Sequence, residues 1–198
     1  MQEPMRRDGQ RRRDAIVEAA LALFVERGIA GTGIEDVRRR ASASPSSIYH
    51  QFDGLPGVVA AVLARIFDEL FASLTERVCA TRTARTAVIA LVDAHLAWVI
   101  EHPGEARVMY EGTSMALPAA HASALAEHKA AQLTAIAAHV APFVERGVLP
   151  EWPLPVLDVV LLGTSHEACR RWLAGAPLDP AWMRRTLPKL AWQSLDAR

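Results

Sequence analysis

The sequence has 198 residues, of which 51% are hydrophobic and 22% charged, with equal numbers of basic and acidic side chains. This composition supports a sizeable core, but no apolar run is long enough to span a membrane. Two distant cysteines, Cys79 and Cys169, exclude a disulfide framework and are expected to be buried thiols. Sustained polar–apolar alternation is nearly absent, so the predicted fold class is all-α.

Residues 1–10 are polar and are expected to be disordered, either as a solvated tail or as an arginine-rich arm that follows DNA. A helix is predicted from Arg12 to Arg27, ended by Gly28 as a C-cap glycine. Its inner face consists of apolar residues at helical spacing: Ile16, Ala20, Leu23 and Phe24. Glu18 interrupts the apolar stretch, which argues against a signal peptide and for a cytoplasmic location.

Residues 32–52 have the pattern of two short helices joined by a tight turn. Thr32 and Glu35 have the spacing of a capping box, which predicts the start of the first helix. Ser44 can cap the second helix, with Pro45 at the first helical position, where a missing N–H costs nothing.

The second of these helices has a distinct inner and outer face. Ile48 and Phe52 are four residues apart and are predicted to point inward. The outward side chains are short or planar hydrogen-bonding groups: Ser46, Ser47, Tyr49, His50 and Gln51. A helix-turn-helix places such a helix in the major groove of DNA. The alternative is a helical hairpin of an unrelated all-α protein.

The run DVRRRASASPSSIYHQF resembles the signature of the TetR/AcrR (tetracycline-repressor) family of bacterial transcriptional regulators. The match is strongest at Val37, Ala41, Ser44, Ile48, Tyr49 and Phe52. The resemblance implies a three-helix DNA-binding head, residues 1–54, and a C-terminal helical bundle for ligand binding and dimerisation, residues 55–198. The residues predicted to contact DNA are Thr32, Arg38, Ser44, Pro45, Ser46, Ser47, Tyr49, His50 and Gln51.

Three positions depart from the family pattern. Arg38 stands where the family usually has a small buried alanine, so it either alters the packing or contacts DNA. Ser42 replaces the turn glycine and must adopt a less favourable backbone conformation if the turn is the same. Leu55 stands where the family usually has a phosphate-contacting lysine, so one anchor on the DNA backbone is missing.

Six helical segments are predicted after this head: Pro56 to Cys79, Ala84 to Glu101, Glu105 to Glu111, Ala119 to Val144, Val156 to Ala174 and Pro180 to Leu195. The last two are apolar on more than one face, which favours an oligomer interface. The family resemblance implies a homodimer formed through these two helices. The alternative is that both faces are buried within one chain.

A mixture of aromatic, sulfur and imidazole side chains in the body is typical of an apolar pocket with a few polar contacts. The resemblance implies a small-molecule effector that weakens DNA binding. The candidate lining residues are Phe67, His95, Trp98, Met109, Tyr110, Met115, His121, His128 and His166. The alternative is that these are ordinary core or surface residues.

No catalytic, cofactor or metal signature is complete. His166-Glu167 begins an H-E-x-x-H zinc pattern, but Arg170 occupies the second histidine position. The expected function is therefore not enzymatic. We expect a repressor that a small molecule releases from double-stranded operator DNA, and the alternative is a ligand-sensing or protein-interaction module with weak or lost DNA binding.

Overall fold

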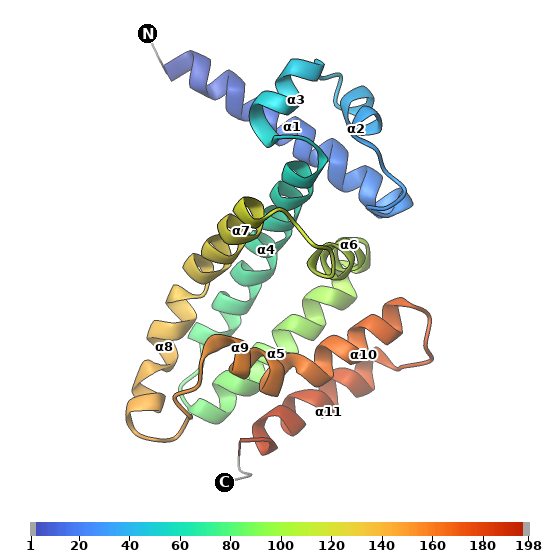
Figure 1. Cartoon of the computed structure of the whole chain (residues 1–198). Coiled ribbons are helices and arrows are strands. Elements are labelled where there is room, and N and C mark those ends of the chain that lie inside the picture. Colours follow the sequence, from blue (N-terminus) through green and yellow to red (C-terminus); the bar gives the residue numbers. More distant parts are fainter. Residues whose placement is uncertain (1–2, 196–198) are drawn as a thin grey trace. The chain divides into compact units, whose positions relative to one another are not determined.

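The structure is a computed structural model and describes residues 3–195, apart from the side chains of residues 3–7 and 154. Within that range the chain forms helices and no β-strand, so the all-α prediction is confirmed (Figure 1). Among the described residues, none of the helices combines the length and apolarity that crossing a membrane requires.

The first three helices, blue to cyan in Figure 1, are α1 (Glu3–Arg27), α2 (Ile34–Arg40) and α3 (Pro45–Phe52). They are followed by α4 (Leu55–Cys79), α5 (Ala84–Glu101), α6 (Pro103–Thr113), α7 (Ala119–Gln132) and α8 (Thr134–Glu145). The last elements are α9 (Leu154–Leu157), a π-helical turn (Asp158–Leu162), α10 (Gly163–Leu173) and α11 (Pro180–Gln193). The order agrees with the predicted helices, with three differences.

The N-terminal segment differs first. Residues 3–10 were expected to be disordered, but they continue α1, which begins at Glu3. The Gln10 side chain donates to Asp14 at 2.7 Å, four residues further along the same helix. Such i, i+4 pairs stabilise a helix. Residues 1 and 2 lie outside the described range.

The other two differences are interruptions of predicted helices. The single helix expected from Ala119 to Val144 is two helices, α7 and α8. At their junction the Thr134 hydroxyl donates to the Ala130 carbonyl at 3.4 Å, a contact that competes with helical hydrogen bonding and bends helices. The helix expected from Val156 is preceded by α9 and widened into the π-helical turn before α10 begins.

The predicted helix-ending glycine and the predicted burial of the two cysteines are confirmed, except at Cys79. Gly28 has a φ angle of 77° and ends α1 in the predicted way. Cys169 is buried as predicted. Cys79 is exposed, so the prediction of a buried thiol is wrong there. Cys79 is the last residue of α4, and its thiol donates to the Ala135 carbonyl at 3.8 Å.

Contacts divide the chain into two compact units. One contains the chain up to Phe67 together with Gly104–Lys129, and the other contains Asp68–Pro103 and the chain from Ala130 onward. Helix α4 therefore contributes to both units. The predicted boundary at residue 54 concerns function, and it stays a proposal.

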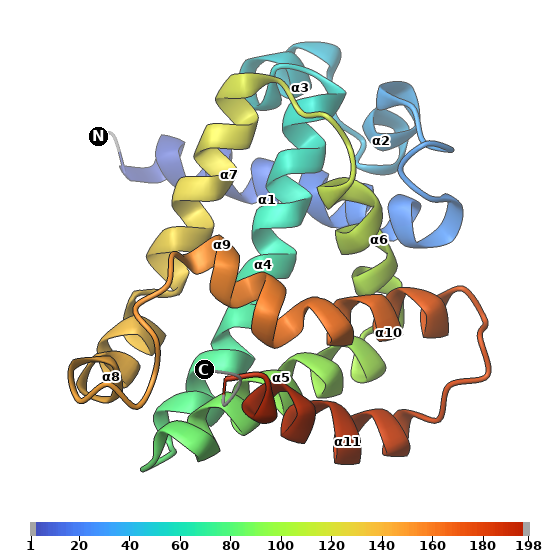
Figure 2. The same ribbon diagram turned by 60° about the horizontal axis from the view of Figure 1, so that its bottom comes forward.

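Each unit has its own apolar core. In the first, α1, α3 and α4 contribute fully buried side chains: Ile16, Phe24, Ile48, Val62 and Leu63. In the second, α10 and α11 both pack on α5 (Figures 1 and 2). Its core includes Val92, Leu96, Cys169, Met183 and Leu187. Asp93 of α5 also accepts two hydrogen bonds from Arg184 of α11, both 2.8 Å long.

Candidate nucleic-acid interface

Helix α3 begins as the sequence predicts. Ser44 is the N-cap, its side-chain oxygen accepts a hydrogen bond from the Ser47 backbone N–H at 3.2 Å, and Pro45 occupies the first turn. The Ser44 hydroxyl also lies 2.8 Å from the Ser47 hydroxyl and 3.0 Å from that of Ser46. Caps of this kind stabilise a helix by about 1 kcal/mol. The start of α3 is therefore fixed by its own residues.

The inner face of α3 is also confirmed, because Ile48 and Phe52 are both buried. Arg13 of α1 supports the same end of the helix. Its guanidinium lies 4.5 Å from the centre of the Phe52 ring, and it donates to the Gln51 carbonyl at 3.1 Å. Arg13 was not among the predicted site residues, and the only sign of its role in the sequence is its position one turn before Ile16 on the inner edge of α1.

The outer face of α3 presents polar groups to solvent. Tyr49 is 61% exposed, and Pro45, Ser46 and His50 are exposed as well. Gln51 differs from the prediction, because it is only half-exposed. Its side-chain oxygen is buried and has no hydrogen-bond partner among the described residues. Ser46, Tyr49 and His50 are consequently the side chains best placed to meet a partner.

Helix α2 starts one residue later than the predicted capping box. Gly33 is the N-cap, and Asp36 accepts from the Gly33 N–H at 3.0 Å. This hydrogen bond, followed by that from Arg39, lowers the pKa of Asp36. Thr32 is only 4% exposed, and its hydroxyl donates to the Gly28 carbonyl at 2.9 Å. The predicted Thr32–Glu35 box is wrong because the end of α1 takes the threonine hydroxyl, and we omit Thr32 from the proposed DNA contacts.

The arginines of α2 are paired with carboxylates of the same unit. Arg38 lies 2.7 Å from Glu35, and Arg40 lies 2.8 Å from Glu26 of α1. Arg39 pairs with Asp36. Exposed ion pairs contribute only about 0–1 kcal/mol, so a phosphate could compete for these arginines. The role of Arg38 on DNA stays a proposal.

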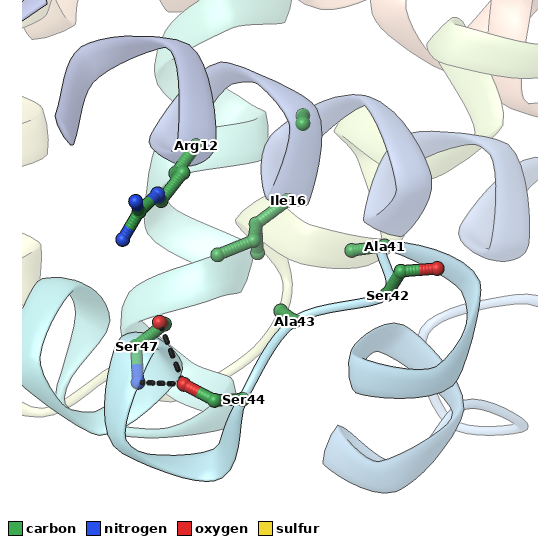
Figure 3. A pocket seen from close by; sticks show the side chains of 8 residues that line it. Arg12, Ile16, Ala41, Ser42, Ala43, Ser44 and Ser47 are labelled. Carbon is green, nitrogen blue, oxygen red and sulfur yellow. Dashed lines mark hydrogen bonds between the residues drawn. The ribbon is translucent and has the colours of Figure 1, made fainter. Parts of the chain in front are cut away.

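A hollow of about 300 Å³ lies between α1 and the turn that joins α2 to α3 (Figure 3). Arg12 and Ile16 line it on one side, and Ser42, Ser44 and Ser47 line it on the other. Ser42 has a φ of 50°, so this turn does adopt the left-handed conformation that the family pattern usually gives to glycine. Arg12 makes no hydrogen bond or ion pair with the described residues.

Comparison with known proteins identifies this helical head. Residues 16–62 match the family model described as "Bacterial regulatory proteins, tetR family". This helical head is therefore similar to the N-terminal region of TetR-family regulators. The matched range extends from α1 through α3 into the first part of α4, which are the elements that form the cap, the turn and the exposed face of α3.

Two curated relatives have informative names. The chain is 33% identical over 81 residues to the HTH-type transcriptional repressor KstR2 of Rhodococcus jostii, covering 41% of this chain and 40% of that protein. It is 31% identical over 85 residues to the HTH-type transcriptional regulator BetI of Burkholderia ambifaria, covering 42% and 44%. The chain thus matches less than half the length of either relative. The expectation of a regulator and not an enzyme agrees with both names.

Solved structures of TetR-type regulators share the fold over nearly the whole chain. The transcriptional regulator FadR of Bacillus subtilis, in complex with stearoyl-CoA, superposes with a TM-score of 0.73 at 14% identity, covering 91% of this chain and 97% of that one. A tetR-family regulator of Shewanella gives 0.71 at 22% identity, covering 93% and 97%. At these identities the likeness concerns the fold alone.

The predicted effector-binding residues do not form one pocket within either unit. His95, Trp98 and His166 belong to the second unit, whereas Phe67, Met109, Tyr110, Met115, His121 and His128 belong to the first. Met115 is 43% exposed, and Phe67 is buried beneath Lys129, whose ammonium lies 4.6 Å from the ring centre. None of the nine lines the hollow near Arg12 or a second one, of about 250 Å³, beside Trp192.

Among the predicted pocket residues of the second unit, His95 and His166 are in contact. Their rings are in edge contact with centroids 4.6 Å apart, and Nε2 of His166 lies 3.5 Å from Oδ1 of Asp158. The pKa of His95 is lowered to about 3, mainly by burial and also by the nearby His166, while Asp158 opposes the shift. His95 is therefore a neutral core histidine at physiological pH.

Proposed function

We propose that this chain is a ligand-responsive DNA-binding transcriptional regulator, a repressor that a small molecule releases from double-stranded operator DNA. The observation that carries the proposal is the two-sided geometry of α3. Its inner face is anchored by Ile48 and Phe52, which are buried, while Ser46, Tyr49 and His50 are exposed on the outer face. Short polar and aromatic groups on such a helix can contact base edges and phosphates in the major groove.

The positive charge needed for phosphate contacts is best supplied by α1. Arg12 is exposed at the hollow next to α3 and has no partner among the described residues. The arginines of α2 are already paired, and Leu55 offers no charge. We therefore propose that Arg12 replaces the anchor that the family usually has at position 55. We propose that the protein binds its operator DNA in the cytoplasm.

The competing proposal is a sensing or interaction module with weak DNA binding. It is favoured by the zero net charge of the chain and by the paired arginines of α2. The two proposals differ in one measurable quantity, the affinity for DNA.

A titration with the DNA beside the chain's own coding region tests the choice. We expect binding that weakens steeply with salt, because neutralised phosphates release counterions. Tyr49→Ala should lower the affinity by about tenfold to hundredfold through lost base and phosphate contacts. Tyr49→Phe is the matched control for the ring, and thermal unfolding checks that both variants remain folded. If neither Tyr49→Ala nor added salt changes the affinity for DNA, the groove-binding model is contradicted.

We also propose that two copies of the chain pair through α10, α11 and the π-helical turn. Members of this family typically bind operator DNA as dimers. Three large apolar side chains remain uncovered on these elements: Val159, Trp182 and Leu190, which are 69%, 43% and 46% exposed. A second copy would remove this apolar area from water. The small-molecule effector is proposed to bind within the helical body.

Sedimentation of the double variant Val159→Glu/Leu190→Glu tests the pairing. An unpaired charge in an interface costs about 3–5 kcal/mol, so the variant should be monomeric at concentrations where the wild type is dimeric. Val148→Glu changes a valine outside these helices that is 47% exposed, close to the 46% of Leu190, and should leave the dimer intact. A double variant that still forms dimers would rule out this surface as the interface.

A further inference from the structure

One carboxylate joins two distant segments of the first compact unit. Glu111 of α6 accepts hydrogen bonds from two consecutive backbone N–H groups that follow α1. Its Oε2 lies 3.1 Å from the Ile29 nitrogen, and its Oε1 lies 3.0 Å from the Ala30 nitrogen. Both oxygens of the side chain are therefore used, across more than 80 residues of sequence.

The helix dipole of α1 does not explain why the Glu111 carboxylate lies at this place. The carboxylate lies at the C-terminal end of α1, where the helix dipole disfavours negative charge. What holds it there is the pair of N–H donors, which the left-handed Gly28, with its φ of 77°, turns toward α6. A side chain at Gly28 would stand 3.4 Å from the Glu111 carboxylate, so the two segments lie in close contact.

Helix α6 is held close to α1 and α4 by two of its glycines. A Cβ atom at Gly104 would lie 2.8 Å from a methyl group of Val25 in α1. A Cβ atom at Gly112 would lie 2.8 Å from a methyl group of Leu63 in α4. Neither distance leaves room for a side chain, so α6 has little freedom to shift unless its neighbours shift with it.

The segment held by Glu111 leads directly into α2. Thr32 closes the same loop by donating to the Gly28 carbonyl, and α2 begins two residues later. Helix α2 then passes through the Ser42 turn into α3. A displacement of Ile29 and Ala30 would consequently change where α2 and α3 stand relative to α1.

We propose that Glu111 is a positioning residue for the DNA-contacting helix. It ties α6 to the loop between α1 and α2 and so sets where α2 and α3 stand relative to α1. This inference rests on the proposed function, because it assigns to Glu111 a role in setting the geometry of the head for DNA.

The substitutions that test the role differ in what they offer the two N–H groups. In Glu111→Gln one oxygen is replaced by an NH2 group, which cannot accept a hydrogen bond. Glu111→Asp keeps the charge but shortens the side chain by one methylene. The matched control is Glu105→Gln, which makes the same change of charge on the same helix. Glu105 makes no hydrogen bond or ion pair with the described residues.

The experiment measures amide hydrogen exchange at Ile29 and Ala30 and affinity for the promoter-proximal DNA, both on the full chain. Glu111→Gln should raise the exchange rate of at least one of these amides by about tenfold and lower the DNA affinity by about tenfold. Glu105→Gln should leave both at the wild-type values. Glu111→Asp should change both quantities in the same direction as Glu111→Gln, and it serves alone if the glutamine variant does not fold.

The outcomes separate this inference from the function on which it rests. Rapid exchange of the Ile29 and Ala30 amides in the wild type would show that their hydrogen bonds to Glu111 do not form. Protected amides that loosen in Glu111→Gln, with unchanged DNA affinity, would overturn the positioning role and leave the proposed function intact. A wild type that binds no DNA would overturn the proposed function, and the positioning role with it.

Discussion

Replacing Gly57 by alanine is expected to disrupt the junction between α3 and α4. Gly57 lies in the first turn of α4 and is buried. A Cβ atom there would stand 1.5 Å from the Phe52 carbonyl oxygen, far inside any real contact distance. That oxygen belongs to the backbone, so no rotamer change can relieve the overlap. The two helices must separate, and Phe52 would lose its packing.

The expected loss of stability is about 3 kcal/mol or more, because forced overpacking typically costs 1–3 kcal/mol even when flexible side chains can yield. Chemical denaturation of the full chain measures it. Gly163→Ala is the matched control, because it also replaces a helical glycine and its Cβ would meet nothing within 4 Å. That variant should be unchanged or more stable by up to about 1 kcal/mol. Equal stability of Gly57→Ala and the wild type would contradict the described junction.

Stability is also expected to fall as the pH is lowered, because of His95. Burial lowers the pKa of its imidazole to about 3 in the folded chain, against 6.5 for an ordinary histidine. Between these two pKa values, His95 is protonated in the unfolded chain and neutral in the folded chain. The stability contributed by neutral His95 is complete above pH 6.5 and is lost as the pH falls toward 3. The loss amounts to about 1.4 kcal/mol per pH unit within that window.

Denaturation at pH 7 and pH 5 measures the effect, which should be about 2 kcal/mol between these two values. His95→Gln cannot titrate, so its stability should change less over the same interval. His50→Gln removes an exposed histidine and should retain the wild-type difference. Because all other titrating groups are shared, the comparison isolates His95. A His95→Gln chain with the full wild-type pH dependence would disprove the assignment.

The start and the two faces of α3 were predictable because their causes lie within a few residues. A serine cap, a proline in the first turn and apolar residues four apart determine that helix almost without help from the rest of the chain. The start of α2 was not predictable in the same way. Two overlapping capping patterns were available, and the contact of Thr32 with the end of α1 decided between them.

The predicted effector-binding residues share only their chemical type, which says nothing about which helices come together. His95 and His166 do meet, but Met109 and Tyr110 belong to the other compact unit. The hydrogen bonds to Glu111 could not be predicted from the sequence for a related reason. A glutamate near a helix end has no local sign that its partners are the N–H groups of Ile29 and Ala30, about 80 positions earlier.

The sequence alone determined the helical class, the family signature and the orientation of α3, since period, capping and turn chemistry act over one or two helical turns. Only the tertiary structure decided which arginines of the head remain unpaired, which histidine is buried and which carboxylate holds the loop before α2. These outcomes depend on groups far apart in the chain approaching within hydrogen-bonding or van der Waals distance. That approach is set by the packing of whole helices, which no local pattern records.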